Sequence, residues 1–369
     1  YTAGEGWHDA RIVPYGPWEM DPATTVFHYA QEIFEGMKAY RTAEGKVQLF
    51  RPECNANRFN DSADRLGMPA IPPEDFVQAV KALVDVDRDW VPHSDGASLY
   101  IRPFCIATDV GLGVHAAKHY RFAIICAPSG AYYAEGLDPV RIYVEDQYIR
   151  AAPGLTGFTK CGGNYAASIK AGELAEERGF SQVLWLDGVE KKYVEEVGSM
   201  NIMFKIDGKI YTAPCTGTVL PGVTRRSIIE LLKDWGYEVC EEHVAIADIM
   251  KAGHDGTLEE VFGTGTAAVV STGGGLPVWR DNMARMNAAG FTVYLRREAE
   301  QIARRLSPYG RQKRPRLRGL DDAELVEFMS RDMAAREPFY AQAQLIVDCG
   351  ELSDDEVVET ILRHTMQNE

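Results

Sequence analysis

This 369-residue sequence lacks the features that would place it in a membrane or outside the cell. No apolar run is long enough to span a bilayer and no leader of charged then apolar residues is recognised, so we expect a cytoplasmic protein with no membrane partner. The seven cysteines contain no Cys-x-x-Cys pair, which favours reduced thiols over a disulfide framework or a zinc site. We therefore expect no bound metal.

Positive charge is scarce as well. The formal net charge of −15 at pH 7 argues against nucleic acid as the main partner, because a polyanion binds to a basic surface. The exception is the stretch 296–318, which holds nine Arg and Lys residues. Apolar residues are abundant instead: they make up 46% of the chain, enough for a large core, and the length predicts two or three domains.

Residues 1–130 mix strand and helix patterns, which is typical of an α+β domain. Strands are predicted for TVFHYAQEIFEGMKAYR with GKVQLF, for LYIRPFCIATD and for YRFAIICAP, and a helix is predicted for NANRFNDSADRLGM. Gly, Pro and Tyr residues are then frequent up to Val140. We place a connection between domains at residues 131–140.

The α+β pattern continues through residues 141–270. GGNYAASIKAGELAEERG predicts a helix closed by Gly179, and QVLWLD predicts a buried strand. YVEEVGSMNIMFKIDGKIYTA predicts a hairpin that turns at the Asp-Gly pair 207–208. LPGVTRRSIIELLKDWG predicts a helix entered through its Pro-Gly pair, with Thr224 as the N-cap.

Residues 271–369 alternate between strand and helix patterns, which is typical of a parallel α/β unit. TVYL predicts a short strand, and the basic segment after it is helical in pattern. DDAELVEFMSRDMAAR predicts a long helix, and SDDEVVETILRH predicts a helix opened by a Ser-x-x-Glu capping box.

Lys160 lies among small residues, in GLTGFTKCGGNYAAS, with a predicted helix starting directly behind it. Most lysines lie on the surface, and that is the ordinary interpretation of any one of them. Small neighbours, however, allow a ligand to approach closely, and desolvation or nearby positive charge makes an amine lose its proton more readily. A lysine of this kind can form a Schiff base.

Eight short stretches occur in the order and spacing of one family: FHYAQEIFEGMKAYR, RPECNANRF, LYIRPF, GFTKCGGNYAAS, QVLWLD, EEVGSMNIMF, LPGVTRRSI and FGTGTAAVV. On these motifs the chain from Tyr1 to Val270 resembles the branched-chain amino-acid aminotransferases. That family has the fold-type IV architecture, α+β with two subdomains, and depends on pyridoxal 5′-phosphate. The resemblance implies a small domain at 1–130 and a cofactor-binding domain at 141–270, the latter truncated.

The resemblance also implies roles in cofactor binding. Lys160 forms the Schiff base and moves the proton between the substrate Cα and C4′ of the cofactor. Glu196, rather than its neighbour Glu195, pairs with the pyridine nitrogen, because a buried carboxylate keeps that nitrogen protonated. Tyr165 hydrogen-bonds the phenolic oxygen. The phosphate is bound by a helix N-terminus and two side chains: the main-chain N–H groups of Val223 and Thr224, with Arg58 and Thr266.

On the substrate side the resemblance implies an apolar pocket with a carboxylate clamp. Its members are Tyr29, Phe34, Tyr100, Arg102 and the main chain of Thr266 and Ala267. The implied reaction is ping-pong: leucine, isoleucine or valine gives its amino group to the cofactor, and 2-oxoglutarate takes it to become glutamate. The family also implies a homodimer.

Residues 271–369 resemble the C-terminal part of the shikimate kinases, through STGGGLPVWRDNMARMNAAGFTVYLRR, RQKRPRL and AAREPFYAQAQLIVD. That family has a P-loop α/β fold and phosphorylates shikimate with ATP. The resemblance implies further site residues: a substrate turn at Gly273, Gly274 and Gly275, a carboxylate clamp at Arg336 and a nucleotide lid at Arg314. The Gly-x-x-x-x-Gly-Lys-Ser/Thr run that cradles the phosphates does not occur in this sequence.

Three alternatives stay open beside an aminotransferase. One is a non-catalytic hybrid of two partial domains, because a seam near Val270 cuts both cores and leaves strand edges unpaired. The second is a shikimate kinase, which the missing P-loop disfavours. The third is another fold-type IV enzyme, such as a D-amino-acid aminotransferase or an aminodeoxychorismate lyase, which the GGNYAAS and EEVGSMN contexts disfavour.

Overall fold

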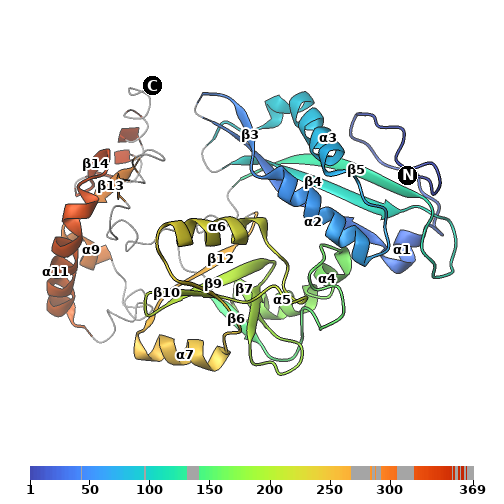
Figure 1. The fold of residues 1–369 in the computed structure, drawn as a ribbon. Coiled ribbons are helices and arrows are strands. Elements are labelled where there is room, and N and C mark those ends of the chain that lie inside the picture. Colours follow the sequence, from blue (N-terminus) through green and yellow to red (C-terminus); the bar gives the residue numbers. More distant parts are fainter. Residues whose placement is uncertain are drawn as a thin grey trace. The chain divides into compact units, whose positions relative to one another are not determined.

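A computed structural model gives the fold of the chain (Figure 1). The chain divides into two compact units, Tyr1–Val270 and Ser271–Glu369. The helices that the structure describes include none long and apolar enough to cross a membrane. The described residues are 1–42, 44–94, 97–130, 141–266, 283–284, 287, 292–305, 320–350, 352–353, 356–357, 359–360 and 363.

The first unit begins with an antiparallel sheet of five strands, in the order β1-β4-β2-β3 with β5 paired to β4. The long strand β4 carries β1 and β2 end to end along one edge and β5 along the other. The strands predicted within residues 32–50, at 99–109 and at 120–128 are therefore confirmed. The strands are β1 (Glu32–Phe34), β2 (Met37–Arg41), β3 (Val47–Leu49), β4 (Ser98–Ala107) and β5 (Tyr120–Ser129).

Two helices, α2 (Pro52–Arg65) and α3 (Pro73–Val86), cover this sheet (Figure 1). Each has proline in its first turn, where the missing N–H costs no hydrogen bond. The rings of Phe59 and Phe76 pack at 5.3 Å, and both contact Phe122 of the sheet. This aromatic cluster forms the core of the domain, and the predicted helix at 55–68 is confirmed within α2.

The stretch before β1 differs from the prediction. Residues Thr25–Tyr29, expected to be a strand, form the short helix α1, which ends at Ala30 in a left-handed conformation. Asp21 starts the turn, since it accepts hydrogen bonds from Ala23 N–H and the Thr24 hydroxyl. The predicted strand is wrong because strand propensity is overridden by the local turn, which directs these residues into a helix and not into the sheet.

The second half of the first unit is built on a sheet of seven strands, in the order β11-β10-β9-β8-β7-β6 with β12 paired to β9. The predicted strand at 182–187 and the turn at 207–208 are confirmed, and Asp207 and Gly208 both have positive φ. The strands are β6 (Ile142–Glu145), β7 (Gln182–Leu186), β8 (Val194–Val197), β9 (Met200–Ile206), β10 (Lys209–Thr212), β11 (Val239–Glu241) and β12 (Leu258–Thr264).

The helices of this half include two corrections. The single helix expected from 162 to 179 is two helices, because the Ser168 hydroxyl donates to the Tyr165 carbonyl at 2.7 Å and the chain bends there. Gly222, not Thr224, is the N-cap of α6, because extended backbone continues through Gly222. The helices are α4 (Gly162–Ala166), α5 (Ile169–Glu177), α6 (Val223–Asp234) and α7 (Ile246–Asp255).

In the described part of the second unit, strands β13 (Val293–Arg296) and β14 (Leu345–Asp348) pair in parallel, as the alternating pattern predicts. Helix α9 (Ala299–Arg305) packs on α11 (Asp322–Tyr340). Asp321 and Glu324 form a capping box at the start of α11. Ser353 and Glu356 exchange the hydrogen bonds of the second capping box, which was also predicted.

Candidate active site

Lys160 lies in the loop before α4, and its backbone is fixed on both sides. Its N–H donates to the Ser62 hydroxyl at 3.0 Å, and its carbonyl accepts the N–H of Phe34 at 2.9 Å. The Nζ atom donates to the Tyr165 hydroxyl at 2.7 Å and lies 4.7 Å from the centre of the Phe34 ring. Groups from β1, α2 and α4 therefore determine where this amine points.

Burial lowers the pKa of the Lys160 amine to about 8. The neighbouring charges have opposite effects: Glu35 and Glu196 raise this pKa, whereas Arg58 and Arg102 lower it. An amine with such a pKa is partly unprotonated near neutral pH, so it can attack a carbonyl carbon. Burial also raises the pKa of Tyr165, whose hydroxyl therefore stays protonated.

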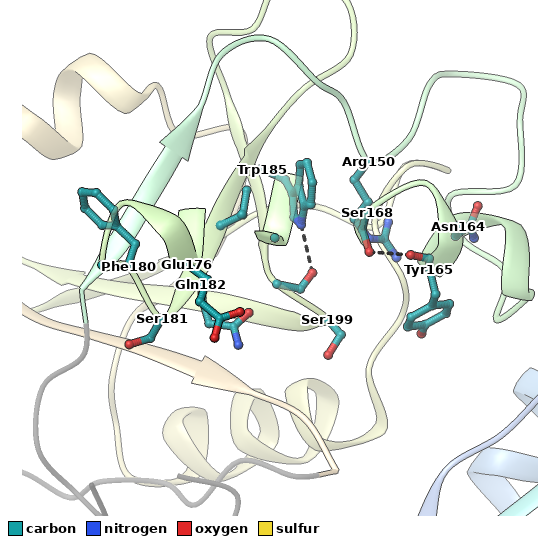
Figure 2. A pocket seen from close by; sticks show the side chains of 14 residues that line it. Arg150, Asn164, Tyr165, Ser168, Glu176, Phe180, Ser181, Gln182, Trp185 and Ser199 are labelled. Atoms are coloured by element: carbon teal, nitrogen blue, oxygen red, sulfur yellow. Dashed lines mark hydrogen bonds between the residues drawn. The ribbon is translucent and has the colours of Figure 1, made fainter. Parts of the chain in front are cut away.

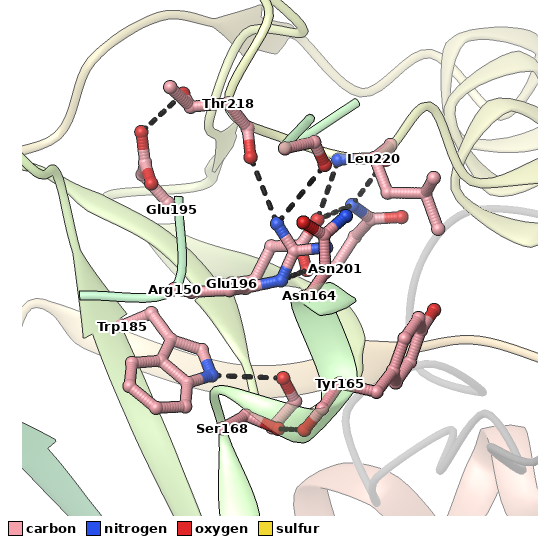
Figure 3. Close-up of polar contacts among 12 residues, drawn as sticks. Arg150, Asn164, Tyr165, Ser168, Trp185, Glu195, Glu196, Asn201, Thr218 and Leu220 are labelled. Atoms are coloured by element: carbon pink, nitrogen blue, oxygen red, sulfur yellow. Dashed lines mark hydrogen bonds and ion pairs between the residues drawn. The ribbon is translucent and has the colours of Figure 1, made fainter. Parts of the chain in front are cut away.

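Glu196 is a buried carboxylate on β8, facing positive and donating groups (Figure 3). Its oxygens accept from Arg150 Nε at 2.8 Å and from the Leu220 N–H at 2.7 Å. Burial raises the pKa of Glu196, while Arg150 and the Leu220 N–H lower it. Its neighbour Glu195 is buried as well and accepts from the Thr218 hydroxyl, because both faces of β8 are covered.

Three of the four predicted phosphate-binding residues lie at the start of α6 or contact the loop before it: Arg58, Val223 and Thr224. Arg58 of α2 is buried, and its Nη1 donates to the Pro221 carbonyl at 3.2 Å. Shortly after that proline come Val223 and Thr224, the first two residues of α6, whose N–H groups have no acceptor within the helix. Thr266 donates through Oγ1 to the Gly36 carbonyl at 3.1 Å, in the turn between β1 and β2.

The predicted substrate residues divide into a cluster and an outlier. The Arg102 guanidinium lies 4.5 Å from the Phe34 ring centre and donates to the Tyr100 hydroxyl at 2.8 Å. Phe34 also packs on Tyr165 at 4.9 Å, so one aromatic ring links Arg102 to the lysine cluster. Tyr29 lies apart from these contacts, and its hydroxyl donates to the Leu112 carbonyl.

A cavity of about 600 Å³ lies beside the Glu196 network (Figure 2). Arg150 and Tyr165 line one end, and Glu176 and Gln182 line the other. Within the described part of the chain, no three His, Cys, Asp or Glu side chains are placed to hold a metal ion. The side chains of Arg150, Glu176 and Gln182 offer this cavity several hydrogen-bonding groups.

The remaining predicted site residues belong to the second half of the chain or to its boundary. Arg336 lies on α11, where its Nε pairs with Asp332 at 3.0 Å and its Nη1 contacts the Tyr340 hydroxyl at 3.4 Å. The others lie outside the described residues: Ala267, Gly273, Gly274, Gly275 and Arg314.

Sequence reasoning missed Glu35, Arg150, Asn201 and the Leu220 N–H. The acidic residue within the apolar run IFEGM was a signal for Glu35, because a charge in a buried strand end needs a partner. Arg150 had no such signal. It lies in a loop, and only the fold shows that its guanidinium reaches Glu196, Thr218 and Gly157.

Comparisons with known proteins identify the family to which this chain is similar. The family described as amino-transferase class IV matches residues 32–272. The chain is 54% identical over 287 residues to branched-chain-amino-acid aminotransferase 2 of Bacillus subtilis (strain 168), covering 78% of this chain and 79% of that protein. It is 51% identical over 272 residues to a probable branched-chain-amino-acid aminotransferase of Streptomyces coelicolor, covering 73% of this chain and 75% of that protein.

Solved structures give the same result. The T.th. branched-chain amino acid aminotransferase with pyridoxamine 5′-phosphate superposes with a TM-score of 0.60 at 31% identity, over 69% of this chain and 80% of that one. The Escherichia coli branched-chain amino acid aminotransferase superposes with a TM-score of 0.56 at 28% identity, over 68% of this chain and 78% of that one. A second family, described as shikimate kinase, matches residues 255–366.

The two-sheet first unit is therefore that of a class IV aminotransferase. Within that class, the chain belongs to the branched-chain-amino-acid aminotransferase family. The resemblance stated from the sequence motifs is thus confirmed for this family. The shikimate kinase resemblance corresponds to a family match over the last part of the chain.

Proposed function

We propose that this protein transfers amino groups between the branched-chain L-amino acids and 2-oxoglutarate, with pyridoxal 5′-phosphate as its cofactor. The observation that carries the proposal is the buried Lys160 amine, with a pKa of about 8, held 2.7 Å from the Tyr165 hydroxyl. The relatives named above, more than half identical over about three quarters of the chain, support the substrate class.

The residues present fit this cofactor. An aldehyde needs an amine, a pyridinium needs a carboxylate, and a phosphate needs cations and N–H donors. Lys160, Glu196 and Arg58 supply these three in one buried region, and their charges are close enough to shift the pKa of Lys160. In addition, the buried Arg102 Nε has no hydrogen-bond partner among the described residues, so it can donate to a substrate carboxylate.

The side chains then act as follows. Bound pyridoxal 5′-phosphate supplies an electron sink for the substrate Cα. Lys160 holds the cofactor through Nζ and, when that nitrogen is free and neutral, takes and returns the proton of the substrate Cα. Glu196 keeps the proton on the ring nitrogen, and Tyr165 donates to the phenolic oxygen. Arg58, Thr266 and the N–H groups of Val223 and Thr224 bind the phosphate.

The substrate residues divide the specificity between them. Phe34 presents an apolar ring to a branched side chain, and Arg102 supplies the positive charge that a carboxylate requires. 2-Oxoglutarate brings a second carboxylate, for which Tyr100 provides a hydroxyl group beside Arg102.

A covalent test separates this function from its alternatives. Addition of pyridoxal 5′-phosphate to the apoprotein is expected to give an absorption band near the visible, and borohydride reduction should fix the cofactor mass on the peptide containing Lys160. Leucine with 2-oxoglutarate should then yield glutamate. K160A should lose the band and the activity, whereas K170A, which removes an exposed lysine of α5, should keep both. A band that persists in K160A would refute the assignment.

We also infer a homodimer. Val110, Leu112 and Val114 expose apolar side chains on one loop, with exposed fractions of 63%, 68% and 81%. Such a loop is typical of an interface, and the Leu112 carbonyl accepts the hydroxyl of Tyr29, which ties it to a substrate residue. Light scattering should give twice the mass of one chain, and L112D should lower it. A monomer at micromolar concentration would contradict this inference.

We infer further that the chain joins two partial domains near Val270 and works in the cytoplasm. The overlap of the two family matches at residues 255–272 supports the junction. The seven cysteines, all in the described part of the chain, are free thiols, which supports a reducing compartment. Shikimate phosphorylation is disfavoured because this sequence has no P-loop. Turnover of ATP and shikimate by the full chain would reverse that conclusion.

A further inference from the structure

Glu35 is a fully buried acid in the turn between β1 and β2, with 0% of its surface exposed. Its Oε1 accepts from Arg58 Nε at 2.7 Å, and its Oε2 accepts from Arg58 Nη2 at 2.9 Å. Asn55 Nδ2 donates to Oε2 at 2.8 Å, and the Gly36 N–H donates to the same atom at 3.1 Å. Both carboxylate oxygens are thus paired within the protein.

This pairing determines the direction of the Arg58 guanidinium. Two of its three nitrogens face Glu35, and the third, Nη1, points to the Pro221 carbonyl at 3.2 Å, directly before the first turn of α6. A bidentate pair permits one orientation of the planar guanidinium, whereas a single bond would let it rotate. Glu35 therefore aims Arg58 at the helix N-terminus.

The same turn reaches the other side chain of the phosphate group. The Gly36 carbonyl accepts the Thr266 hydroxyl at 3.1 Å. The turn has no room for a side chain at position 36, because a Cβ on Gly36 would lie 2.3 Å from the Tyr100 hydroxyl oxygen. Glu35 and Gly36 thus contact Arg58 on one side and Thr266 on the other.

The charge of Arg58 also determines the ionisation state of Glu35. Burial opposes ionisation of Glu35, but the charge and hydrogen bonds of Arg58, helped by Lys160 and Asn55, outweigh it and lower the pKa of Glu35. The pair is therefore ionised, and its net charge is zero. A carboxylate this close would repel a phosphate group if charge alone mattered, so any benefit to phosphate binding must come from the orientation of Arg58.

We propose that Glu35 is a positioning residue that fixes Arg58 toward the N-terminus of α6 and thereby sets the affinity of the site for the 5′-phosphate of the cofactor. The proposal rests on the function proposed above. It differs from a purely structural ion pair in one respect: Glu35 should matter for the phosphate group and not for the rest of the cofactor.

The test compares two ligands that differ only in the phosphate. The affinity of the full-length apoprotein for pyridoxal 5′-phosphate and for pyridoxal is measured by absorbance titration. E35Q keeps the size of the side chain but places an NH₂ group against the guanidinium, so it loses one of the two bonds. We expect E35Q to weaken pyridoxal 5′-phosphate binding about 10- to 100-fold and to change pyridoxal binding by less than about twofold.

Further variants show whether the effect passes through Arg58. R58M should weaken pyridoxal 5′-phosphate binding, and E35Q should add nothing to R58M. N55A leaves both charges in place but removes one bond to Glu35, so it should give a smaller loss of about threefold, again for the phosphorylated ligand alone. E53Q, which removes an exposed carboxylate from the same helix, is the matched control and should bind both ligands like the wild type.

The outcomes are distinct. If E35Q or N55A weakens both ligands equally, leaves both unchanged or binds pyridoxal 5′-phosphate more tightly, the positioning role is refuted. N55A still decides the question if E35Q does not fold. If the wild type itself gives no band with pyridoxal 5′-phosphate, the proposed function fails instead, before any variant is compared.

Discussion

At the residue scale, the site is a set of buried charges that balance one another. Arg58 is paired with Glu35, Arg150 with Glu196, and the Lys160 amine lies within reach of both pairs. A buried charge without a partner is costly, because water no longer solvates it. Each of these residues is therefore important to stability as well as to chemistry.

Removal of Arg150 should show this cost. R150A leaves Glu196 buried without its cation, and we expect the free energy of unfolding to fall by about 3 to 5 kcal/mol, as measured by urea denaturation. R11A, which removes an exposed arginine near the start of the chain, is the control and should change stability by less than about 0.5 kcal/mol. An R150A protein as stable as the wild type would mean that Glu196 is protonated in the folded state.

The amine of Lys160 should make stability depend on pH. Its pKa is about 8 in the folded protein against 10.5 for an ordinary lysine, so between these values the unfolded chain binds more protons and stability rises with pH. K160M removes this penalty. We expect the K160M apoprotein to be more stable than the wild type by up to about 3 kcal/mol below pH 8, with the difference shrinking toward pH 10.5.

Urea denaturation at several pH values measures this difference. K170M removes an exposed lysine from the same region and should follow the wild type throughout. A constant difference between K160M and the wild type at every pH would show that the gain comes from packing and not from the titration of Lys160.

At the scale of elements, the proposed phosphate site depends on the backbone conformation at the start of α6. Gly222 caps the helix, and the structure leaves no space for a side chain there: a Cβ would lie 2.1 Å from Asn201 Oδ1. Asn201 in turn donates to the Leu220 carbonyl at 2.9 Å. Strand β9 therefore fixes the loop that presents the first N–H groups of α6.

Gly222 should not tolerate alanine. G222A must displace Asn201 or the loop, so we expect stability to fall by about 1 to 3 kcal/mol and the affinity for inorganic phosphate to fall with it. In G172A, on α5, the new Cβ meets no atom within 4 Å, and the helix should gain about 0.5 to 1 kcal/mol. Calorimetry of both variants, with and without phosphate, checks the contrast.

At the scale of the whole molecule, each of the two units has buried residues of its own in the part of the chain that the structure describes. The first unit contains the aromatic cluster of Phe59 and the core of the second sheet, around Leu184 and Phe204. In the second unit, Leu345 and Val347 form one cluster and Leu325 the centre of another. The proposed cofactor residues all lie in the first unit.

The two units should unfold separately. We expect scanning calorimetry of the full chain to show two unfolding transitions. Pyridoxal 5′-phosphate should raise the midpoint temperature of the first unit's transition and leave that of the second unit unchanged. When its concentration is about 100 times its dissociation constant, the ligand adds about 3 kcal/mol to the free energy of unfolding of that unit. A single transition that shifts as a whole would show that the two units stabilise each other.

The strong local patterns predicted most elements of the first unit. Alternation identified β4 and β5, and an Asp-Gly pair identified the turn before β10. The errors fall where tertiary contacts override propensity: α1 in place of a strand, the break between α4 and α5, and Gly222 in place of Thr224 as the N-cap. Lys160, Tyr165 and Glu196 were identified as site residues from motif resemblance, and their roles stay predictions.

The sequence by itself determined the family, the lysine and the approximate order of strands and helices, because these depend on residue types at short spacing. Only the tertiary structure decided how the charges are compensated. Glu35 pairs with Arg58, which comes from the following helix, and Arg150 reaches Glu196 from a loop. Partners so far apart along the chain leave no periodic signal, and it is the folding of two sheets around one buried site that brings them within hydrogen-bond distance.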